Sequence, residues 1–152
     1  MNGDKKPEEY GLVNTDKTKL IFEETPEKYI QHRPGRGGKT FDYVATGYVI
    51  DRLNKIFNYM WSFEVKEKSQ NQSITQVQVL GKLTGYIVIP GNTPIVQAIS
   101  KEQWGGSDVK KNDNGLPIDI GDDFKAATSD ALKKCASLFG IASDIYWKGG
   151  NI

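Results

Sequence analysis

The sequence contains few of the residues that metal centres and disulfide frameworks need. Its 152 residues include one cysteine, Cys135, and one histidine, His32. A single cysteine can form no intrachain disulfide, which fits a reducing compartment. The same counts exclude a zinc site built from cysteine and histidine, and any centre with several histidines. We expect the protein to use no metal and no other cofactor.

Long hydrophobic runs and an excess of one charge are missing too. The longest aliphatic or aromatic run, Tyr86–Ile89, is too short to cross a bilayer, and the first eleven residues contain no apolar run typical of a secretory signal. These features predict a cytoplasmic protein. Twenty basic and nineteen acidic residues leave a net charge of +1, so an anion site requires local clustering of charge.

The chain length fits one domain, residues 18–152, preceded by a polar segment, residues 1–17, that we expect to be a flexible arm. In the first part of the domain, residues 18–31 predict a short helix broken near Pro26. Residues 32–40 predict a loop rich in glycine and arginine, and Phe41–Ala45 a strand. Helical spacing then predicts a helix over 47–58, with Thr46 as its N-cap and Asn58 at its end.

The middle of the chain has the pattern of an antiparallel sheet. Trp61, Phe63 and Val65 alternate with polar residues, and two β-branched segments follow, Ile74–Ile89 and Ile95–Ser100. Residues 67–73 and Pro90–Thr93 are typical of turns. Gly81 and Gly85 are expected to form bulges or bends. The pattern therefore predicts a meander of about three strands.

The last part of the chain predicts a long loop followed by a helix. Gly105–Gly121 is rich in glycine, proline, asparagine and aspartate, and loops of this length are often functional or at an interface. Asp122 or Asp123 then begins a helix that ends at Gly140. Its apolar stripe consists of Phe124, Ala127, Ala131, Cys135 and Leu138. The fold class is α+β, with an antiparallel meander packed on helices.

The first candidate site is the basic segment with Arg33, Arg36 and Lys39 among glycines. Glycines let the backbone approach a ligand closely, and arginine and lysine bind phosphate oxygens. A solvated surface loop explains this composition equally well. A nucleotide-hydrolysing P-loop is the weaker enzymatic alternative, because the glycine expected six residues before Lys39 is Arg33 and strand rather than helix follows Thr40.

The second candidate site lies on the last helix, where Lys133 and Lys134 follow Lys125 at a spacing that keeps them roughly on one side. A solvated helix face is the ordinary explanation for such lysines. Among the aromatic residues, most suit a core or a subunit interface. Tyr43, beside the basic segment, is the one that we expect to stack on a base.

Two stretches together resemble the Rad52 family of single-strand annealing proteins, with its bacterial and phage members. The first, Tyr29–Val65, has the family's tyrosine, arginine, glycine-rich loop, lysine, short strand, helix and closing tryptophan. The second, Asp123–Gly140, matches the helix pattern A-x-T/S-D-x-L-K-K/R-x-x-x-x-F-G. The resemblance covers roughly residues 27–147. It implies a β-β-β-α core that assembles into a ring and carries DNA in a basic groove.

The resemblance also implies roles for particular residues. Arg33, Tyr43, Lys133 and Lys134 match the groove residues, and we add Arg36 and Lys39 from their chemistry. Lys125 is a weaker candidate. Lys66 and Lys68 are candidates for a second, outer DNA site. Some members have an arginine where this chain has Ser137, so we expect this groove to hold DNA less tightly.

The function that the resemblance implies is binding of single-stranded DNA and annealing of complementary strands in recombination and double-strand break repair, without ATP and without catalysis. The implied partners are single-stranded DNA and further copies of the chain in a ring or helical arc; a nuclease and a single-strand binding protein are further candidates. The family's long C-terminal tail is missing after Trp147, which fits either a compact phage or bacterial member or a truncated chain. The alternatives are a passive DNA-binding protein, and a ring-forming protein without a nucleic-acid role.

Overall fold

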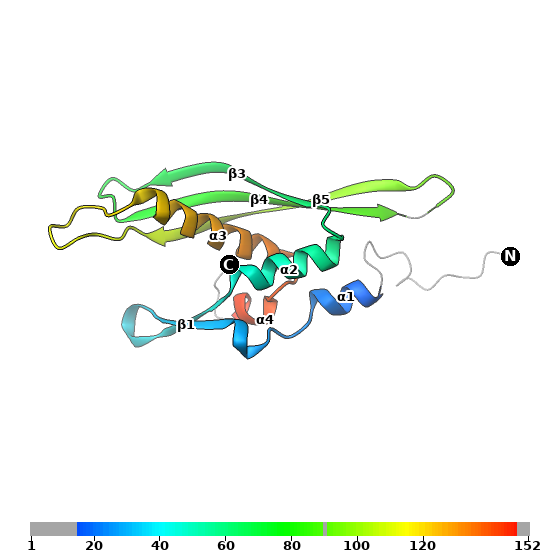
Figure 1. The fold of residues 1–152 in the computed structure, drawn as a ribbon, viewed down its shortest axis with the longest axis horizontal. Helices are drawn as coiled ribbons and strands as arrows, with labels where there is room; N and C mark the ends of the chain where they lie inside the picture. Colours follow the sequence, from blue (N-terminus) through cyan, green and yellow to red (C-terminus); the bar gives the residue numbers. More distant parts are fainter. Residues whose placement is uncertain (1–14, 90, 149–152) are drawn as a thin grey trace.

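The computed structural model describes residues 15–89 and 91–148, and they form two layers (Figure 1). One layer is a long three-stranded sheet with a helix along it, and the other gathers the hairpin and the shorter helices. The elements in chain order are α1 Thr15–Ile21, the 3-10 turn Glu27–Tyr29, β1 Ile30–Pro34, the 3-10 turn Arg36–Gly38, β2 Thr40–Val44, α2 Thr46–Phe57, β3 Trp61–Gln70, β4 Gln76–Ile89, β5 Ile95–Asp108, α3 Ile120–Leu138 and α4 Ser143–Tyr146.

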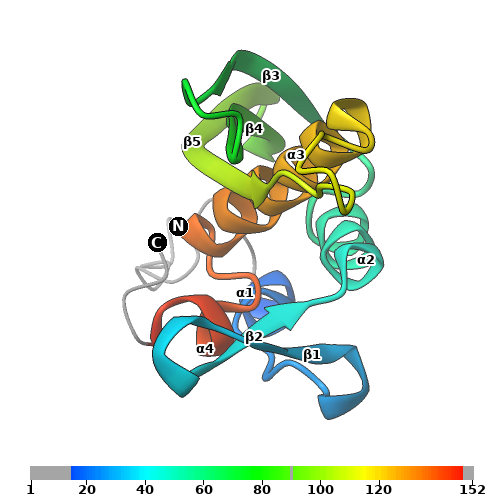
Figure 2. The same cartoon turned by 90° about the vertical axis from the view of Figure 1, so that its left-hand side faces the viewer.

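The sheet is antiparallel with the order β3-β4-β5, and α3 packs against one of its faces (Figure 2). Burial alternates along β4, because successive side chains of a strand point to opposite faces. The buried face of β4 presents Val77, Val79, Leu83 and Ile87. Helix α3 packs its small residues close to the sheet, and Ala127, Ala131 and Cys135 are fully buried. The predicted α+β class and the β-β-β-α core are confirmed.

Of the bulges or bends expected at the two glycines of β4, no bulge lies on β4 itself, but the bulge of β3 lies opposite Gly81. The ladder between β4 and β5 runs through both without a break, and the register shift lies on β3, between Val65 and Glu67. A Cβ on Gly81 would lie 2.4 Å from the ring of Phe63, and one on Gly85 would lie 2.3 Å from the ring of Phe57. The glycines are therefore needed to admit aromatic rings into the core.

Both outer strands are longer than predicted. Strand β3 continues to Gln70 through most of the expected turn, and Asn71 sets the turn by accepting hydrogen bonds from the backbone of Thr75 and Gln76 at 2.8 and 3.0 Å. Strand β5 continues to Asp108, into the predicted loop. The reason is Gly105, whose Cβ would lie only 2.1 Å from the backbone nitrogen of Ala131. This glycine allows close packing of a strand and a helix and does not mark a turn.

The segment predicted as a loop over residues 32–40 is mostly a hairpin. Strand β1 pairs with β2 from Ile30↔Val44 to Pro34↔Thr40, so residues 35–39 alone make the turn. Thr46 is the first residue of α2 and not its N-cap; Ala45 occupies that position and makes no side-chain capping bond. Asn58 ends α2 in the left-handed conformation, with φ of 51°, as predicted.

The start of α3 is also earlier than predicted. The helix begins at Ile120, and the side chain of its N-cap, Asp119, accepts a hydrogen bond from the backbone of Asp122 at 3.1 Å. Asp122 and Asp123 lie in the first turn, where their charge is favourable for the helix dipole. Of the predicted arm, residues 15–17 belong to α1, and residues 1–14 lie outside the described residues. No helix in the described part of the chain is long and apolar enough to span a membrane.

Candidate nucleic-acid interface

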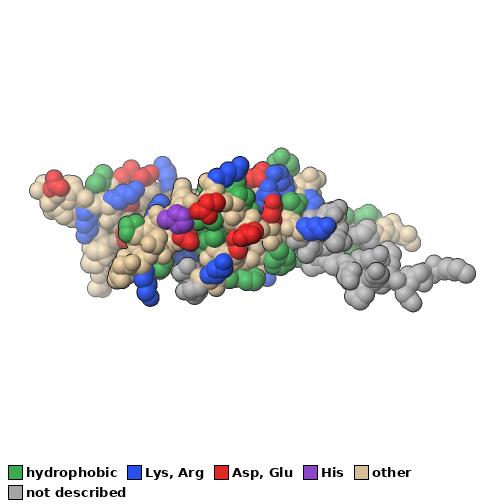
Figure 3. Space-filling view, turned by 90° about the horizontal axis from the view of Figure 1, so that it is seen from below, with side chains coloured by type: hydrophobic (Ala, Val, Ile, Leu, Met, Phe, Trp, Pro, Cys, Tyr) green, Lys and Arg blue, Asp and Glu red, His purple; other side chains and the backbone are tan. Residues whose placement is uncertain are grey.

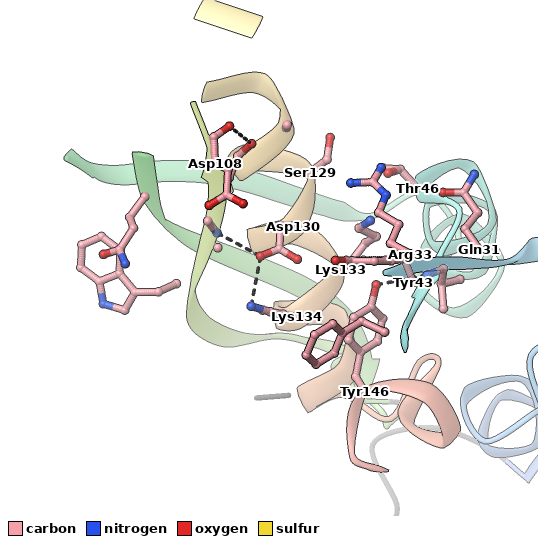
Figure 4. Close-up of a pocket in the computed structure, with 18 of the residues that line it drawn as sticks. Gln31, Arg33, Tyr43, Thr46, Asp108, Ser129, Asp130, Lys133, Lys134 and Tyr146 are labelled. Carbon is pink, nitrogen blue, oxygen red and sulfur yellow. Dashed lines mark hydrogen bonds and ion pairs between the residues drawn. The ribbon is translucent and has the colours of Figure 1, made fainter. Parts of the chain in front are cut away.

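A groove of about 850 Å³ separates the β1–β2 hairpin from α3 and the edge of β5 (Figure 4). Its lining comes from β1, β2, β4, β5 and α3, which are far apart in the sequence. At one end the hairpin faces the middle of α3, and at the other β4 and β5 reach their ends beside the start of α3. The groove is therefore a product of the tertiary fold.

At the hairpin end, two cations lie over one aromatic ring, that of Tyr43. The guanidinium carbon of Arg33 is 4.8 Å from the ring centroid, and the Nζ of Lys133 is 5.8 Å from it. Arg33 comes from β1, Tyr43 from β2 and Lys133 from α3, so three elements converge on this point. Cation–π contacts at these distances hold the charges without neutralising them. We call these residues, together with Lys134, the cationic cluster.

The pKa of Lys133 is lowered in the folded protein. Burial is the main cause, and the charges of Arg33 and Lys134 act in the same direction, while Asp130 opposes them. Burial and the neighbouring cations disfavour the protonated form of Lys133. The negative charge of a nearby phosphate would favour that form. The cluster therefore gathers positive charge that a nearby anion would stabilise.

Asp130 is a further side chain of the groove that was not predicted from the sequence as a site residue. Its carboxylate accepts a hydrogen bond from the backbone of Gly106 at 3.0 Å and forms an ion pair with Lys134 at 3.0 Å. It thereby joins α3 to the edge of β5 and holds the lysine in the groove. The sequence carries a signal for the ion pair, because Asp130 and Lys134 are four residues apart on a helix.

The opposite end of the groove was also missed. Trp104 on β5 lies there with 39% of its surface exposed, and Gln76, Gln78 and Asp108 line the groove beside it. The sequence predicted that the strand ends at Ser100, so it did not place Trp104 in a sheet. Without the register of β5, no pattern in the sequence connects this tryptophan with Tyr43.

Several predicted site residues lie outside the groove. Lys39 in the hairpin turn and Lys125 on α3 are exposed and do not line it. The side chain of Arg36 is outside the described residues. Lys66 lies at the bulge of β3 and pairs with Glu102 at 3.1 Å, and the Nζ of Lys68 lies 5.8 Å from the ring centroid of Phe124.

Ser137 does not face the groove either. It is fully buried, its hydroxyl donates to the carbonyl of Lys134 at 2.7 Å, and its own carbonyl accepts from the indole of Trp147 at 3.0 Å. The expectation that this groove holds DNA less tightly because serine stands here in place of arginine stays a prediction. The serine instead helps to fix the end of α3 against the residues that follow.

The hairpin geometry contradicts the P-loop alternative. Gly38 ends a 3-10 turn, Lys39 follows it, and Thr40 begins β2. A P-loop needs a strand before the glycine-rich loop and a helix after the lysine. Here the segment connects two antiparallel strands, so the backbone cannot form a phosphate cradle at a helix N-terminus.

His32 stabilises the hairpin beside the groove. Its Nδ1 lies 2.6 Å from the carboxylate of Asp42, directly across from it in the register, and its Nε2 lies 3.4 Å from that of Glu27. In Figure 3 it is the purple side chain, with acidic side chains next to it. The hydrogen bonds that the imidazole donates to Asp42, and then to Glu27, raise the pKa of His32. Among the described residues, no group of three metal-ligating side chains is suited to hold a metal ion.

Fold and groove together define a class: a β-β-β-α domain whose cationic groove suits the phosphate backbone of a nucleic acid. The comparison with family models gives the family, because residues 15–148 match the model of the Rad52/22 family double-strand break repair proteins. This match covers nearly the whole chain, and the protein belongs to that family of DNA repair and recombination proteins. A search of curated proteins finds no match.

Proposed function

We propose that this protein binds single-stranded DNA in the groove and anneals complementary strands during homologous recombination and double-strand break repair, without ATP. The observation that carries the proposal is the convergence of Arg33 and Lys133 on the ring of Tyr43, with Lys134 beside them. These residue types match both parts of a single strand, since cations bind its phosphates and an aromatic ring stacks on a base.

The mechanism is physical. Lysine and arginine displace counterions from the strand, so the gain in entropy drives binding and the affinity falls steeply with salt. A strand held by its phosphates is kept extended, and its base edges stay accessible to a complementary strand. Base pairing then supplies the free energy of annealing, so no nucleotide hydrolysis is required.

Several copies of the chain, arranged as a ring or a helical arc, complete the proposed assembly. One groove contacts a short stretch of DNA. Once it is bound, the groove of the next copy is held close to the same strand, so its binding is effectively intramolecular and the avidity rises. The proposed partners are therefore single-stranded DNA and the chain itself, with a nuclease and a single-strand binding protein acting before and beside it. In the cationic cluster, Arg33, Tyr43, Lys133 and Lys134 are the proposed DNA contacts. Arg36, Lys39 and Lys125 are supporting candidates outside it.

An annealing assay with complementary oligonucleotides, one of them labelled, tests this proposal. The protein should accelerate annealing to the same extent with and without ATP, and the double variant Lys133→Ala/Lys134→Ala should lose most of the acceleration. Lys55→Ala is the matched control, because Lys55 forms an i,i+4 pair with Asp51 on α2, outside the groove. If the protein binds each strand but slows annealing, the alternative of a passive DNA-binding protein is correct. A double variant that anneals like the parent would contradict the groove assignment.

A further inference from the structure

The two ends of the groove differ in chemistry. The hairpin end holds the cationic cluster, whereas the β5 end is lined by Trp104, Gln76, Gln78 and Asp108. At this second end the positive charge of Lys110 is offset, because Lys110 pairs with Asp122 at 3.6 Å. Asp108 adds negative charge there, and its carboxylate accepts a hydrogen bond from Gln76 at 3.2 Å. A phosphate is favoured at the hairpin end and finds no excess of positive charge at the β5 end.

Carboxylates also divide the groove between its ends. Asp130 lies beside Lys134 and against Gly106, with its side chain 17% exposed. Together with Asp108 it repels phosphate oxygens from the β5 edge while leaving neutral groups unaffected. A nucleobase is neutral, planar and rich in hydrogen-bonding groups, and is the part of a nucleotide that this end can accept.

The exposure of Trp104 has a structural cause. In the register it lies opposite Leu80, on the face of the sheet away from α3, and the core of the sheet is on the other face. Strand β5 is the edge strand of the sheet, and Trp104, Gln76 and Gln78 line the groove where it passes this edge. A large exposed ring beside this edge forms a stacking surface at the end of the groove.

We propose that Trp104 stacks on the face of a nucleobase of the bound strand, so that the base edge stays accessible to a complementary strand. The strand then lies with its phosphates toward the hairpin and its bases toward the edge of β5. This inference rests on the proposed binding of single-stranded DNA and adds an orientation to it. The stacking is tolerant of sequence, because every base has a π-face.

Intrinsic fluorescence tests the proposal, since stacking of a base on an indole quenches its emission. The intact protein is titrated at low salt with an oligothymidylate and with an abasic strand of the same length. Anisotropy of a labelled strand measures affinity separately. Trp104→Phe should remove most of the quenching and keep most of the affinity, whereas Trp147→Phe, which changes an exposed tryptophan outside the groove, should keep the quenching. Trp104→Ala should bind the thymidylate roughly 5- to 150-fold more weakly and the abasic strand unchanged.

The outcomes separate this inference from the proposed function. Loss of quenching in Trp104→Phe, with a loss of affinity in Trp104→Ala confined to the strand that has bases, supports stacking. Full quenching in Trp104→Phe, or an equal loss for both strands, overturns it and leaves DNA binding intact. A parent protein that binds neither strand at low salt overturns the proposed function and this inference with it. If Trp104→Ala does not fold, quenching in Trp104→Phe decides the question.

Discussion

The groove and the outer face of the sheet both carry lysines, but they arrange them in opposite ways. On the outer face, Lys82 lies between Glu64 and Glu102 in the register of the three strands, and Lys66 pairs with Glu102 at 3.1 Å. In the groove, Arg33 and Lys133 lie over the same ring. Charges of opposite sign alternate in the first region, whereas in the second two cations share one ring and Asp130 pairs with Lys134 beside them.

This difference shows why the net charge of +1 says little about function. Interleaved charges cancel within a Debye length, about 10 Å at moderate salt, so the outer face presents a weak field to a phosphate backbone. Gathered charges add: burial is the main cause of the lowered pKa of Lys133, and the charges of Arg33 and Lys134 act in the same direction. The cationic cluster is thus costly to the free protein and favourable for binding an anion.

The largest expected effect concerns the close contact that forms the floor of the groove. Gly105→Ala should lower the free energy of unfolding by about 3 kcal/mol, because its Cβ would lie 2.1 Å from the backbone of Ala131. Gly106→Ala is the matched control, since its nearest contact would be an ordinary 3.6 Å. Denaturant unfolding measures both. Equal losses in the two variants would show that the contact between β5 and α3 does not depend on this glycine.

The next effect concerns the ring that both cations share. Tyr43→Ala should weaken DNA binding by about 1–3 kcal/mol, because it removes a stacking surface and the ring that holds Arg33 and Lys133. Tyr43→Phe keeps the ring and should bind nearly as well. Anisotropy titrations measure the affinity, and unfolding curves check the fold. An affinity unchanged in Tyr43→Ala, with lower stability, would place Tyr43 in the core and not in the interface.

A smaller effect is expected from the carboxylate in the groove. Asp130→Asn keeps an acceptor for the backbone of Gly106 but releases Lys134 from its ion pair, so DNA binding at low salt should tighten by about 0.5–1 kcal/mol. Asp113→Asn, in the exposed loop after β5, is the control for a general loss of negative charge. If both variants tighten binding equally, the effect of Asp130 is long-range and the groove is not divided.

The smallest effect is a dependence of stability on pH. The pKa of His32 is raised in the folded protein, so the stabilisation by its two carboxylates is fully present below the unfolded value of 6.5 and is lost as the pH rises through the folded value. His32→Gln should therefore lower the melting temperature slightly at acidic pH, and the difference should vanish at alkaline pH. A difference that is constant over this range would mean that the histidine acts through packing alone.

Much of the fold followed from periodicity. The alternation in Trp61–Val65 and the helical stripe through Ala127, Ala131 and Cys135 are local signals, so strands and helices were placed from them. The errors lie at the glycines, because Gly81 and Gly105 serve close packing that depends on a neighbouring ring or helix. The hairpin was missed because β1 is mostly exposed and shows no alternation.

The site was harder to predict than the fold. Arg33, Tyr43, Lys133 and Lys134 were connected through the resemblance of two stretches to a family, and the structure brings them to one groove. Composition alone did not distinguish any of them from an ordinary surface residue. Trp104 and Asp130 were missed because their positions follow from the register of β5 and its contact with α3, which no local pattern contains.

The comparison of groove and outer face is tested most directly by the salt dependence of single-stranded DNA binding. The slope of log K against log salt is measured for the parent, Lys133→Ala and Lys66→Ala, with Lys55→Ala as the control. We expect the slope to become shallower by about 0.7 in Lys133→Ala, which loses a phosphate contact, and to stay near the parent value in Lys66→Ala, whose charge Glu102 offsets. Equal slopes for the parent and Lys133→Ala, or a larger change in Lys66→Ala, would contradict the assignment of DNA to the groove.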